Sequence, residues 1–405
     1  MKDMSVKERF LRYIQIETTS LPDKSTCPST PGQMDLANLL ASELKEMGAH
    51  EVRVSDTGTV YAVIPAKGGL QDRMGLIAHM DTSDAVPGVT RPRCIPDYQG
   101  GPVILDEGIV LDDEALLSNL VGQELIVTDG HSVLGADDKA GVAEIMEMAS
   151  RLLAPDAPDH CRVCVAFTPD EEIGSGVDHF DVNGFGAEYA YTVDGGALGE
   201  LEYENFNAAS CKVCIRGLSF HPGDSKNRMV NACLIAGKFM SLLPEAETPE
   251  HTEGYEGFFH LCGIRGDVES TNMEYLIRDH NRERFEARKK RMEQTAEYLN
   301  QVYGPGTVTL SIKDSYYNME EKIRPHMDMI ERARKAFEAH QISTVTLPVR
   351  GGTDGARLSY EGLPCPNLST GGYNFHSRKE VITVQALESM TDVLVTLTTL
   401  PDMKA

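Results

Sequence analysis

The sequence predicts an α/β domain that is interrupted by a smaller α+β unit, and three observations lead to this fold class. The 405 residues exceed the roughly 250 to 300 that one hydrophobic core usually accommodates. Before residue 207, apolar strand-like runs alternate with amphipathic helices, as in α/β domains. Between residues 207 and 315 the order changes, and the α/β pattern then resumes. We therefore predict three stretches, 1–206, 207–315 and 316–405, of which the first and third form one discontinuous domain.

The first stretch begins with a helix predicted over 30–47. Thr30 is a capping residue, Pro31 takes the first helical position, Gln33 stands three residues after the cap, and Gly48 ends the helix. Leucines recur on one face in between. Apolar runs then predict strands over 59–65, 74–80, 163–168 and 189–193, with a helix over 139–153.

The second stretch reads as strand, helix, two strands, long helix and strand. The ranges are 209–216, 227–243, 258–268, 272–279, 281–302 and 307–313. The third stretch then predicts a helix over 327–339, a strand over 343–347 and a C-terminal helix. Strands that share a sheet with helices segregated to one part of the sequence are typical of an α+β unit.

Charge and hydropathy exclude two classes of partner. The formal net charge of −24 argues against nucleic acid, which needs a basic face. The one basic run, 282–291, is interleaved with acids at helical spacing, which favours a solvated helix surface. No window approaches the roughly 18 to 20 apolar residues of a membrane span. Residues 1–10 are charged and lack a secretory signal, so a cytoplasmic location is expected.

Metal-ligand residue types recur where the predicted strands end. His79 and Asp81 close one strand, Glu171 and Glu172 follow the next, and Asp194 follows the third. In open α/β sheets, ligands bind at this carboxyl edge. Two further candidates stand elsewhere: Asp137 at the start of a helix, and His376 at the end of a glycine-rich loop.

These residues could bind two metal ions. Two ions about 3.5 to 4 Å apart need about two ligands each that bind only that ion, and a carboxylate that bridges both ions. His79 would be a ligand, and Asp81, two residues along the strand, could hold its ring. Each residue also has an ordinary explanation. Asp137 and its neighbour could cap a helix, the Glu171 pair could lie in a solvated loop, and Asp194 could belong to a turn. Their joint occurrence favours the metal site.

Several segments resemble a known family. Residues 78–82 (AHMDT), 135–141 (GADDKAG), 168–174 (TPDEEIG) and 192–196 (TVDGG) are similar to the di-zinc metallopeptidases that include glutamate carboxypeptidase, aminoacylase and succinyl-diaminopimelate desuccinylase. Residues 252–258, 314–319, 350–355 and 371–376 resemble the tripeptide aminopeptidases among them. The resemblance covers nearly the whole chain. It implies a mixed-sheet exopeptidase domain with an inserted lid or dimerisation domain.

The resemblance also implies roles for the ligand-type residues. His79 and Asp194 would hold one zinc ion, and Glu172 and His376 a second one. Asp137 would bridge the two ions, because the bridging acid of the family stands two places before the motif lysine, here Lys139. Glu171 would act as general base and take a proton from a water shared by the two ions, and Asp81 would support His79 without binding metal.

Residues of the inserted unit would complete the site. His221 resembles the family histidine that stabilises the oxyanion, often across a dimer interface, and Asn231 matches its partner motif. Without that resemblance, His221 would be read as a turn residue. Arg278 and Arg350 are candidates for binding the substrate's C-terminal carboxylate, since the arginine fork matches a carboxylate. Salt bridges to nearby acids are the alternative explanation.

The leading functional prediction is therefore a zinc aminopeptidase that releases the N-terminal residue of tripeptides and possesses two Zn²⁺ per subunit. It would take small peptides, bind neither nucleic acid nor membrane, and could form a homodimer through the inserted unit. A carboxypeptidase, dipeptidase or N-acyl amino acid deacylase with the same metal chemistry is the first alternative. A non-catalytic, zinc-stabilised peptide-binding protein is the second, and the presence of Glu171 argues against it.

Overall fold

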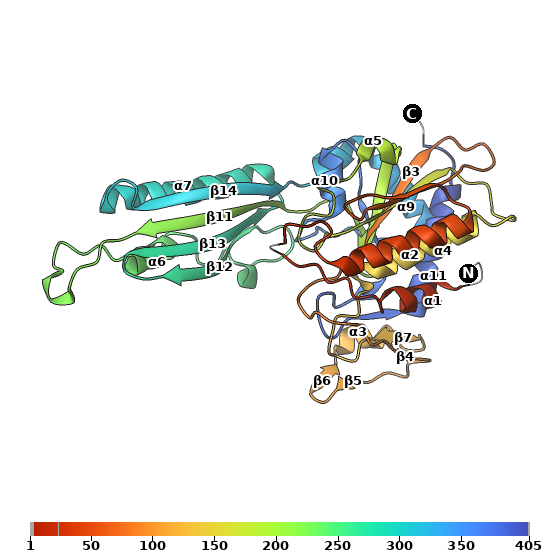
Figure 1. Cartoon of the computed structure of the whole chain (residues 1–405), viewed down its shortest axis with the longest axis horizontal. Helices are drawn as coiled ribbons and strands as arrows, with labels where there is room; N and C mark the ends of the chain where they lie inside the picture. The colour runs from red at the N-terminus through yellow and green to blue at the C-terminus, as the bar shows by residue number, and fades with distance from the viewer. Residues whose placement is uncertain (1–3, 23, 404–405) are drawn as a thin grey trace. The chain divides into compact units, whose positions relative to one another are not determined.

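The computed structural model describes residues 4–22 and 24–403. The chain divides into two compact units (Figure 1). The first comprises Met1–Tyr203, Glu321–Leu347 and Thr353–Ala405, and the second Glu204–Glu320 and Pro348–Gly352. The short segment Pro348–Gly352 thus belongs to the second unit, although it stands well beyond the inserted stretch that the sequence pattern predicts.

A seven-stranded mixed sheet forms the centre of the first unit, in the order β1-β2-β8-β3-β9-β15-β10. The strands are β1 (His50–Val54), β2 (Val60–Ile64), β3 (Arg73–His79), β8 (Arg162–Thr168), β9 (Tyr189–Gly195), β10 (Leu201–Glu202) and β15 (Asn367–Ser369). The four strands β8, β3, β9 and β15 are parallel, and the outer strands pair antiparallel. The carboxyl ends of the parallel strands therefore lie at one edge of the sheet.

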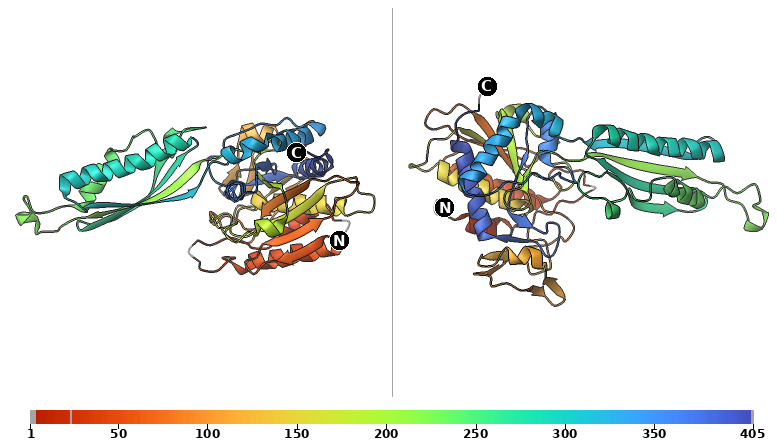
Figure 2. Two further views of the ribbon diagram at one scale, coloured as in Figure 1. Left: turned by 90° about the horizontal axis from the view of Figure 1, so that it is seen from above. Right: turned by 180° about the vertical axis from the view of Figure 1, so that it is seen from behind.

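Helices cover both faces of this sheet (Figures 1 and 2). They are α1 (Val6–Tyr13), α2 (Pro31–Met47), α4 (Ala136–Leu152), α5 (Val182–Phe185), α9 (Met327–Ala339), α10 (Asp354–Tyr360) and α11 (Val384–Thr399), with a single turn, α8 (Glu320–Ile323), before α9. α2 packs on β1 and β2, α4 on β3 and β9, and α11 contacts both α4 and α9. α5 packs on β8 and α10 on β9, where Tyr61, Phe180 and Phe185 form an aromatic cluster. Of the described helices, none combines the length and apolar character that crossing a bilayer requires.

A second, smaller sheet joins the segment before α4 to the C-terminal part of the chain. It has the order β16-β17-β7-β4. Its strands are β4 (Arg93–Ile95), β7 (Leu125–Val127), β16 (Gly372–Tyr373) and β17 (Val381–Thr383), and the hairpin of β5 (Val103–Asp106) and β6 (Ile109–Leu111) and the helix α3 (Glu114–Ser118) accompany it. β17 pairs antiparallel with β7, with Val381 opposite Val127. The sequence pattern predicts no element between residues 81 and 135.

The second unit has its own antiparallel sheet, ordered β12-β13-β11-β14. Its elements are β11 (Asn207–Arg216), α6 (Ala232–Ser241), β12 (Phe258–Gly266), β13 (Ser270–Asp279), α7 (Arg282–Tyr303) and β14 (Val308–Tyr316). Burial alternates along β11 and β13, as expected for a sheet with one solvated face. The buried face packs against α6 and α7 around Phe239, Ile277 and Phe285.

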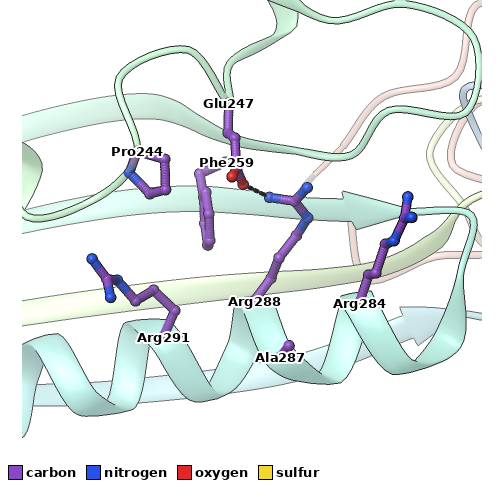
Figure 3. Close-up of a pocket in the computed structure, with 7 residues that line it drawn as sticks. All are labelled: Pro244, Glu247, Phe259, Arg284, Ala287, Arg288 and Arg291. Atoms are coloured by element: carbon purple, nitrogen blue, oxygen red, sulfur yellow. Dashed lines mark hydrogen bonds and ion pairs between the residues drawn. The ribbon is translucent and has the colours of Figure 1, made fainter.

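The basic run 282–291 lies on α7. Its ion pairs join Arg282 to Glu286 (3.2 Å), Arg288 to Asp279 (2.9 Å) and Lys289 to Asp314 (2.9 Å). Arg288 also pairs with Glu247 beside Phe259, in a cavity of about 530 Å³ that Arg284 and Arg291 help to line (Figure 3). These ion pairs offset much of the positive charge of the run, as expected for a solvated helix surface.

Two sequence predictions of secondary structure were wrong. The helix predicted over 227–243 begins only at Ala232, because Asn227 has a φ of 59° and Asn231 caps the helix by accepting from the Leu234 N–H. Residues 343–347, all of them described, form no strand, and Val345 makes only an isolated bridge to Glu200. Both segments carry apolar residues at the spacing of the predicted element. The backbone of Val345, however, bonds to Gly199 and Leu201, and Asn231 caps the later start of the helix.

Candidate metal centre

Adjacent parallel strands bring the predicted ligands to one edge of the main sheet. His79 is the last residue of β3, and it lies opposite Thr168, the last residue of β8. Asp194 lies on β9, which pairs with β3 on its other side. Because the three strands are parallel and in register, their carboxyl ends place these side chains together.

Asp137 lies between two histidines. Its Oδ1 is 2.9 Å from His79 Nε2, and its Oδ2 is 2.9 Å from His376 Nε2. Asp194 Oδ1 is 3.4 Å from the same His79 nitrogen, and Glu172 Oε2 is 2.9 Å from the His376 nitrogen. The five side chains thus form two groups, one around each histidine, that share the Asp137 carboxylate.

The neighbouring acid, Asp138, has a different environment. It is fully buried, and its Oδ2 accepts a hydrogen bond from the backbone N–H of His79 at 3.0 Å. One of its carboxylate oxygens also lies within 4.8 Å of a ring nitrogen of His79 and of a carboxylate oxygen of Asp194, so Asp138 too could bind a cation there. Asp138, however, contacts one histidine only, whereas Asp137 contacts both.

Asp81 supports both the histidine and the paired glutamates. The ring Nδ1 of His79 is 3.1 Å from the Asp81 carbonyl oxygen and 3.4 Å from its Oδ1. The same carboxylate accepts the backbone N–H groups of Glu171 at 3.0 Å and Glu172 at 3.1 Å. The sequence predicted that Asp81 supports the His79 ring. It did not predict that Asp81 also holds the turn over residues 171–174, which is called the glutamate turn below.

A second buried acid fixes this turn from the other side. Asp170 has a positive φ of 54° and accepts hydrogen bonds from Ser29 and from the Gln33 amide at 2.7 Å. Its own N–H donates to the Gln33 side-chain oxygen at 3.0 Å. Gln33 was expected to help to cap α2, but its two-sided bond to Asp170 instead ties the start of that helix to the glutamate turn.

The acids at this edge lie in an environment that disfavours their charge. Burial raises the pKa of Glu172 to about 7, that of Asp194 to about 6 and that of Asp354 to about 7. Burial also raises the pKa of Glu171 well above its ordinary value, and the charges of Asp194 and Asp354 add to this shift. Such a concentration of carboxylates needs a compensating positive charge.

The histidines supply part of that charge. Although burial opposes it, hydrogen bonds from His376 and His79 lower the pKa of Asp137. Hydrogen bonds to Asp137 and Glu172 raise the pKa of His376 to about 11. The histidine protons thus occupy positions from which a divalent cation would displace them, since imidazole binds metal in its neutral form.

The donor set fits zinc. Imidazole nitrogens and carboxylate oxygens are both common zinc ligands. Among the described residues, Glu172 Oε1 and Asp138 Oδ1 are buried without any hydrogen-bond partner. A buried carboxylate oxygen without a donor is costly unless a cation lies nearby. The residues present could therefore hold two cations, one at each histidine.

The predicted residues of the inserted stretch lie in the second unit. His221 is exposed, and its Nδ1 accepts from the Gly223 N–H at 3.2 Å, whereas Asn231 is the cap of α6. Arg278 lies on β13 over the Tyr316 ring, with its Nη1 buried and unpartnered among the described residues. Arg350 donates to the carbonyls of Thr252, Gly254 and Glu256. Arg350 thus already stabilises the loop 252–256.

Sequence reasoning missed three supporting acids. Asp170 and Asp354 stand within segments that carry the family resemblance, but nothing in their local pattern distinguishes them from turn or capping residues. Asp354 Oδ2 accepts from Oγ1 of Thr168, the last residue of β8, at 2.8 Å. Glu380, four residues after His376, accepts backbone hydrogen bonds at the start of α4. All three contact segments that are distant in the sequence.

The clustered histidines and carboxylates make this edge of the sheet a candidate metal site, in a fold that the chain shares with solved peptidases. A family model described as the peptidase dimerisation domain matches residues 203–307. The chain resembles the solved aminopeptidase PepT of Bacillus cereus with a TM-score of 0.77 and 22% identity, over 98% of each chain. It also resembles a dinuclear metal-binding peptidase of Bacillus subtilis with a TM-score of 0.66 and 15% identity, over 98% of each chain.

Sequence comparison identifies the family more narrowly. The chain is 48% identical to peptidase T of Halothermothrix orenii over 396 residues, which is 96% of this chain and 97% of that protein. It is equally 48% identical to peptidase T of Geobacillus sp. over 404 residues, with 98% of each chain covered. The chain belongs to the peptidase T family and is a peptide hydrolase. The family resemblance drawn from the sequence motifs is confirmed.

Proposed function

We propose that this protein is a zinc-dependent tripeptide aminopeptidase. The observation that carries the proposal is the position of Asp137, whose two oxygens each lie 2.9 Å from a different histidine. That arrangement suits a carboxylate that bridges two metal ions. His79 and Asp194 would bind one ion, and His376 and Glu172 the other.

The chemistry divides between the metal ions and the protein. When bound, two zinc ions would supply Lewis acidity that polarises the peptide carbonyl and lowers the pKa of a bound water to about 7. Glu171 would take a proton from the attacking water and deliver it to the departing amine. Its raised pKa suits a group that must both accept and donate a proton. Asp81 would keep Glu171 in place through the backbone N–H that it accepts.

The names of the relatives support the tripeptide specificity. One solved structure of similar fold is a tripeptidase of Staphylococcus aureus, with a TM-score of 0.78 and 19% identity over 98% of each chain. A tripeptide has a free carboxylate that an arginine could bind, and Arg278 has a buried nitrogen available for it. His221 and Asn231 would assist at the oxyanion, and Arg350 would act at the substrate carboxylate or by holding its loop. The dimerisation-domain match supports a homodimer through the second unit.

A panel of peptides tests the proposal. The zinc-restored enzyme should release the N-terminal residue of tripeptides, and it should act far less on dipeptides, tetrapeptides and N-acetylated tripeptides. Products would be identified by mass spectrometry. Cleavage of the acetylated peptides, or release of the C-terminal residue first, would contradict the aminopeptidase proposal and favour a deacylase or a carboxypeptidase.

The role of Arg278 gives a second test. Arg278→Met should lower kcat/KM for tripeptides by about 10- to 100-fold, the loss expected for a hydrogen-bonded ion pair. The effect should vanish for tripeptides with an amidated C-terminus, because these lack the carboxylate. The control is Arg282→Met, since Arg282 lies in the same unit over Tyr317 and pairs with Glu286. An equal loss on both kinds of peptide would exclude carboxylate binding by Arg278.

A further inference from the structure

Glu380 is a buried carboxylate that serves the backbone beside the metal centre. Its side chain is almost fully enclosed, with an exposed fraction of 1%. Oε2 accepts the backbone N–H groups of Leu134 at 2.6 Å and Gly135 at 2.9 Å. Oε1 accepts the N–H of Asp137 itself at 3.1 Å. One side chain thus binds three N–H groups at the start of α4, where helix geometry leaves donors unpaired.

The loop that carries Glu380 also carries His376. Asn374 and His376 both have positive φ, of 59° and 57°. The loop is closed by its own hydrogen bonds, from Ser377 Oγ to the Asn374 carbonyl at 2.6 Å and from the Asn374 amide to the Lys379 carbonyl at 3.2 Å. Directly after Glu380, the chain enters β17, which pairs with β7. His376 and Glu380 therefore belong to one internally bonded loop.

Two contacts join the loop 374–380, which carries His376, to residues 134–137, which carry Asp137. His376 reaches the Asp137 carboxylate through its ring, and Glu380 reaches the Asp137 backbone through its carboxylate. The first contact is the one that a metal ion would replace. The second contact is independent of the metal, so it can hold Asp137 and His376 at a fixed separation before any ion binds.

We propose that Glu380 is a positioning residue that fixes the Asp137 carboxylate relative to His376 and so preorganises the metal centre. The proposal rests on the proposed function, in which Asp137 and His376 are metal ligands. Residues that orient ligands through hydrogen bonds typically change metal affinity by about 10- to 100-fold when they are mutated. Glu380 would act on the backbone of the bridging ligand rather than on its carboxylate.

The test is zinc affinity of Glu380→Gln, measured by competition with a chromophoric chelator on the metal-free protein. An amide offers one oxygen where the carboxylate offers two, and its NH₂ group would face one of the three N–H donors. We expect zinc to bind at least about 10-fold more weakly. Activity should recover when zinc is raised, because the catalytic groups are unchanged. Glu380→Asp, which keeps the charge but is one methylene shorter, should give a smaller loss.

The control is Glu43→Gln. Glu43 is a carboxylate of the same unit that is equally buried, and it binds Arg9, Arg12 and Tyr13 instead of a ligand segment. Glu43→Gln should lower the thermal midpoint of the metal-free protein without changing zinc affinity. If Glu380→Gln also lowers only the midpoint, or if both Glu380 variants bind zinc as the wild type does, the positioning role is excluded. If the wild-type protein itself binds no zinc, the proposed function fails first, so the two failures are distinguishable.

Discussion

Glu171→Gln should lower kcat at least about 100-fold, the usual effect of removing a general base, while two zinc ions stay bound. Two groups of potential metal ligands share His79, one with Asp138 and Asp194 and one with Asp137 and Glu172, and Glu171 belongs to neither. Within residues 4–22 and 24–403, its carboxylate makes no hydrogen bond or ion pair, whereas its backbone N–H donates to Asp81. Glutamine should keep this backbone contact and lose only the ability to take up a proton. The measurement is kcat on a tripeptide, together with metal content by mass spectrometry.

Glu172→Gln is the matched control, since it makes the same change one residue away. Glu172 Oε2 lies 2.9 Å from His376, so its replacement should weaken zinc binding. Activity of Glu172→Gln should therefore depend on the zinc concentration, and that of Glu171→Gln should not. Near-normal turnover in Glu171→Gln would refute its role as the base. Metal loss in that variant would instead make Glu171 a ligand.

Asp137→Asn should have the second large effect, a loss of zinc from both positions. A bridging ligand must offer one oxygen to each ion, and an asparagine has only one oxygen. The expected loss in zinc affinity exceeds the roughly 10- to 100-fold that is typical for residues behind the ligands. Activity should fall below detection at ordinary zinc concentrations. Zinc stoichiometry by calorimetric titration measures the effect directly.

Asp138→Asn is the comparison for this prediction. The asparagine oxygen can still accept the backbone N–H of His79, which Asp138 accepts at 3.0 Å. We therefore expect two zinc ions per chain in Asp138→Asn. Retention of both ions by Asp137→Asn and their loss from Asp138→Asn would transfer the bridge to Asp138.

Much of the fold could be predicted because its main strands are long and buried. β3 and β8 read as continuous apolar runs, and α2 ends at Gly48 in the left-handed conformation as expected. The short strands escaped prediction. β15 has three residues and β10 has two, too few to show a period; β15 pairs with β9 and β10, and β10 pairs with β15. Their position follows from tertiary packing alone.

Only those residues of the candidate site could be predicted that have a metal-ligand side chain and stand at the end of a predicted strand or in a recognised motif. His79, Glu172 and Asp194 were placed in this way, and the structure brings them together with Asp137 and His376. The supporting contacts could not be found by local rules, which look three or four residues along the chain. Gln33 bonds to a residue 137 positions away, and Glu380 to one 243 positions away. Both side chains satisfy buried N–H groups that only the folded chain brings near.

The position of β15 in the sequence determines the order in which the two units can fold during translation. This strand lies inside the main sheet, yet it consists of residues 367–369, and the loop of His376 follows it. The second unit, by contrast, is nearly complete once residue 320 has emerged. Because nascent domains fold as units as they emerge, the inserted unit can fold while the main sheet of the first unit still lacks an interior strand. A nascent chain therefore acquires its candidate metal site only after residue 376 has been translated.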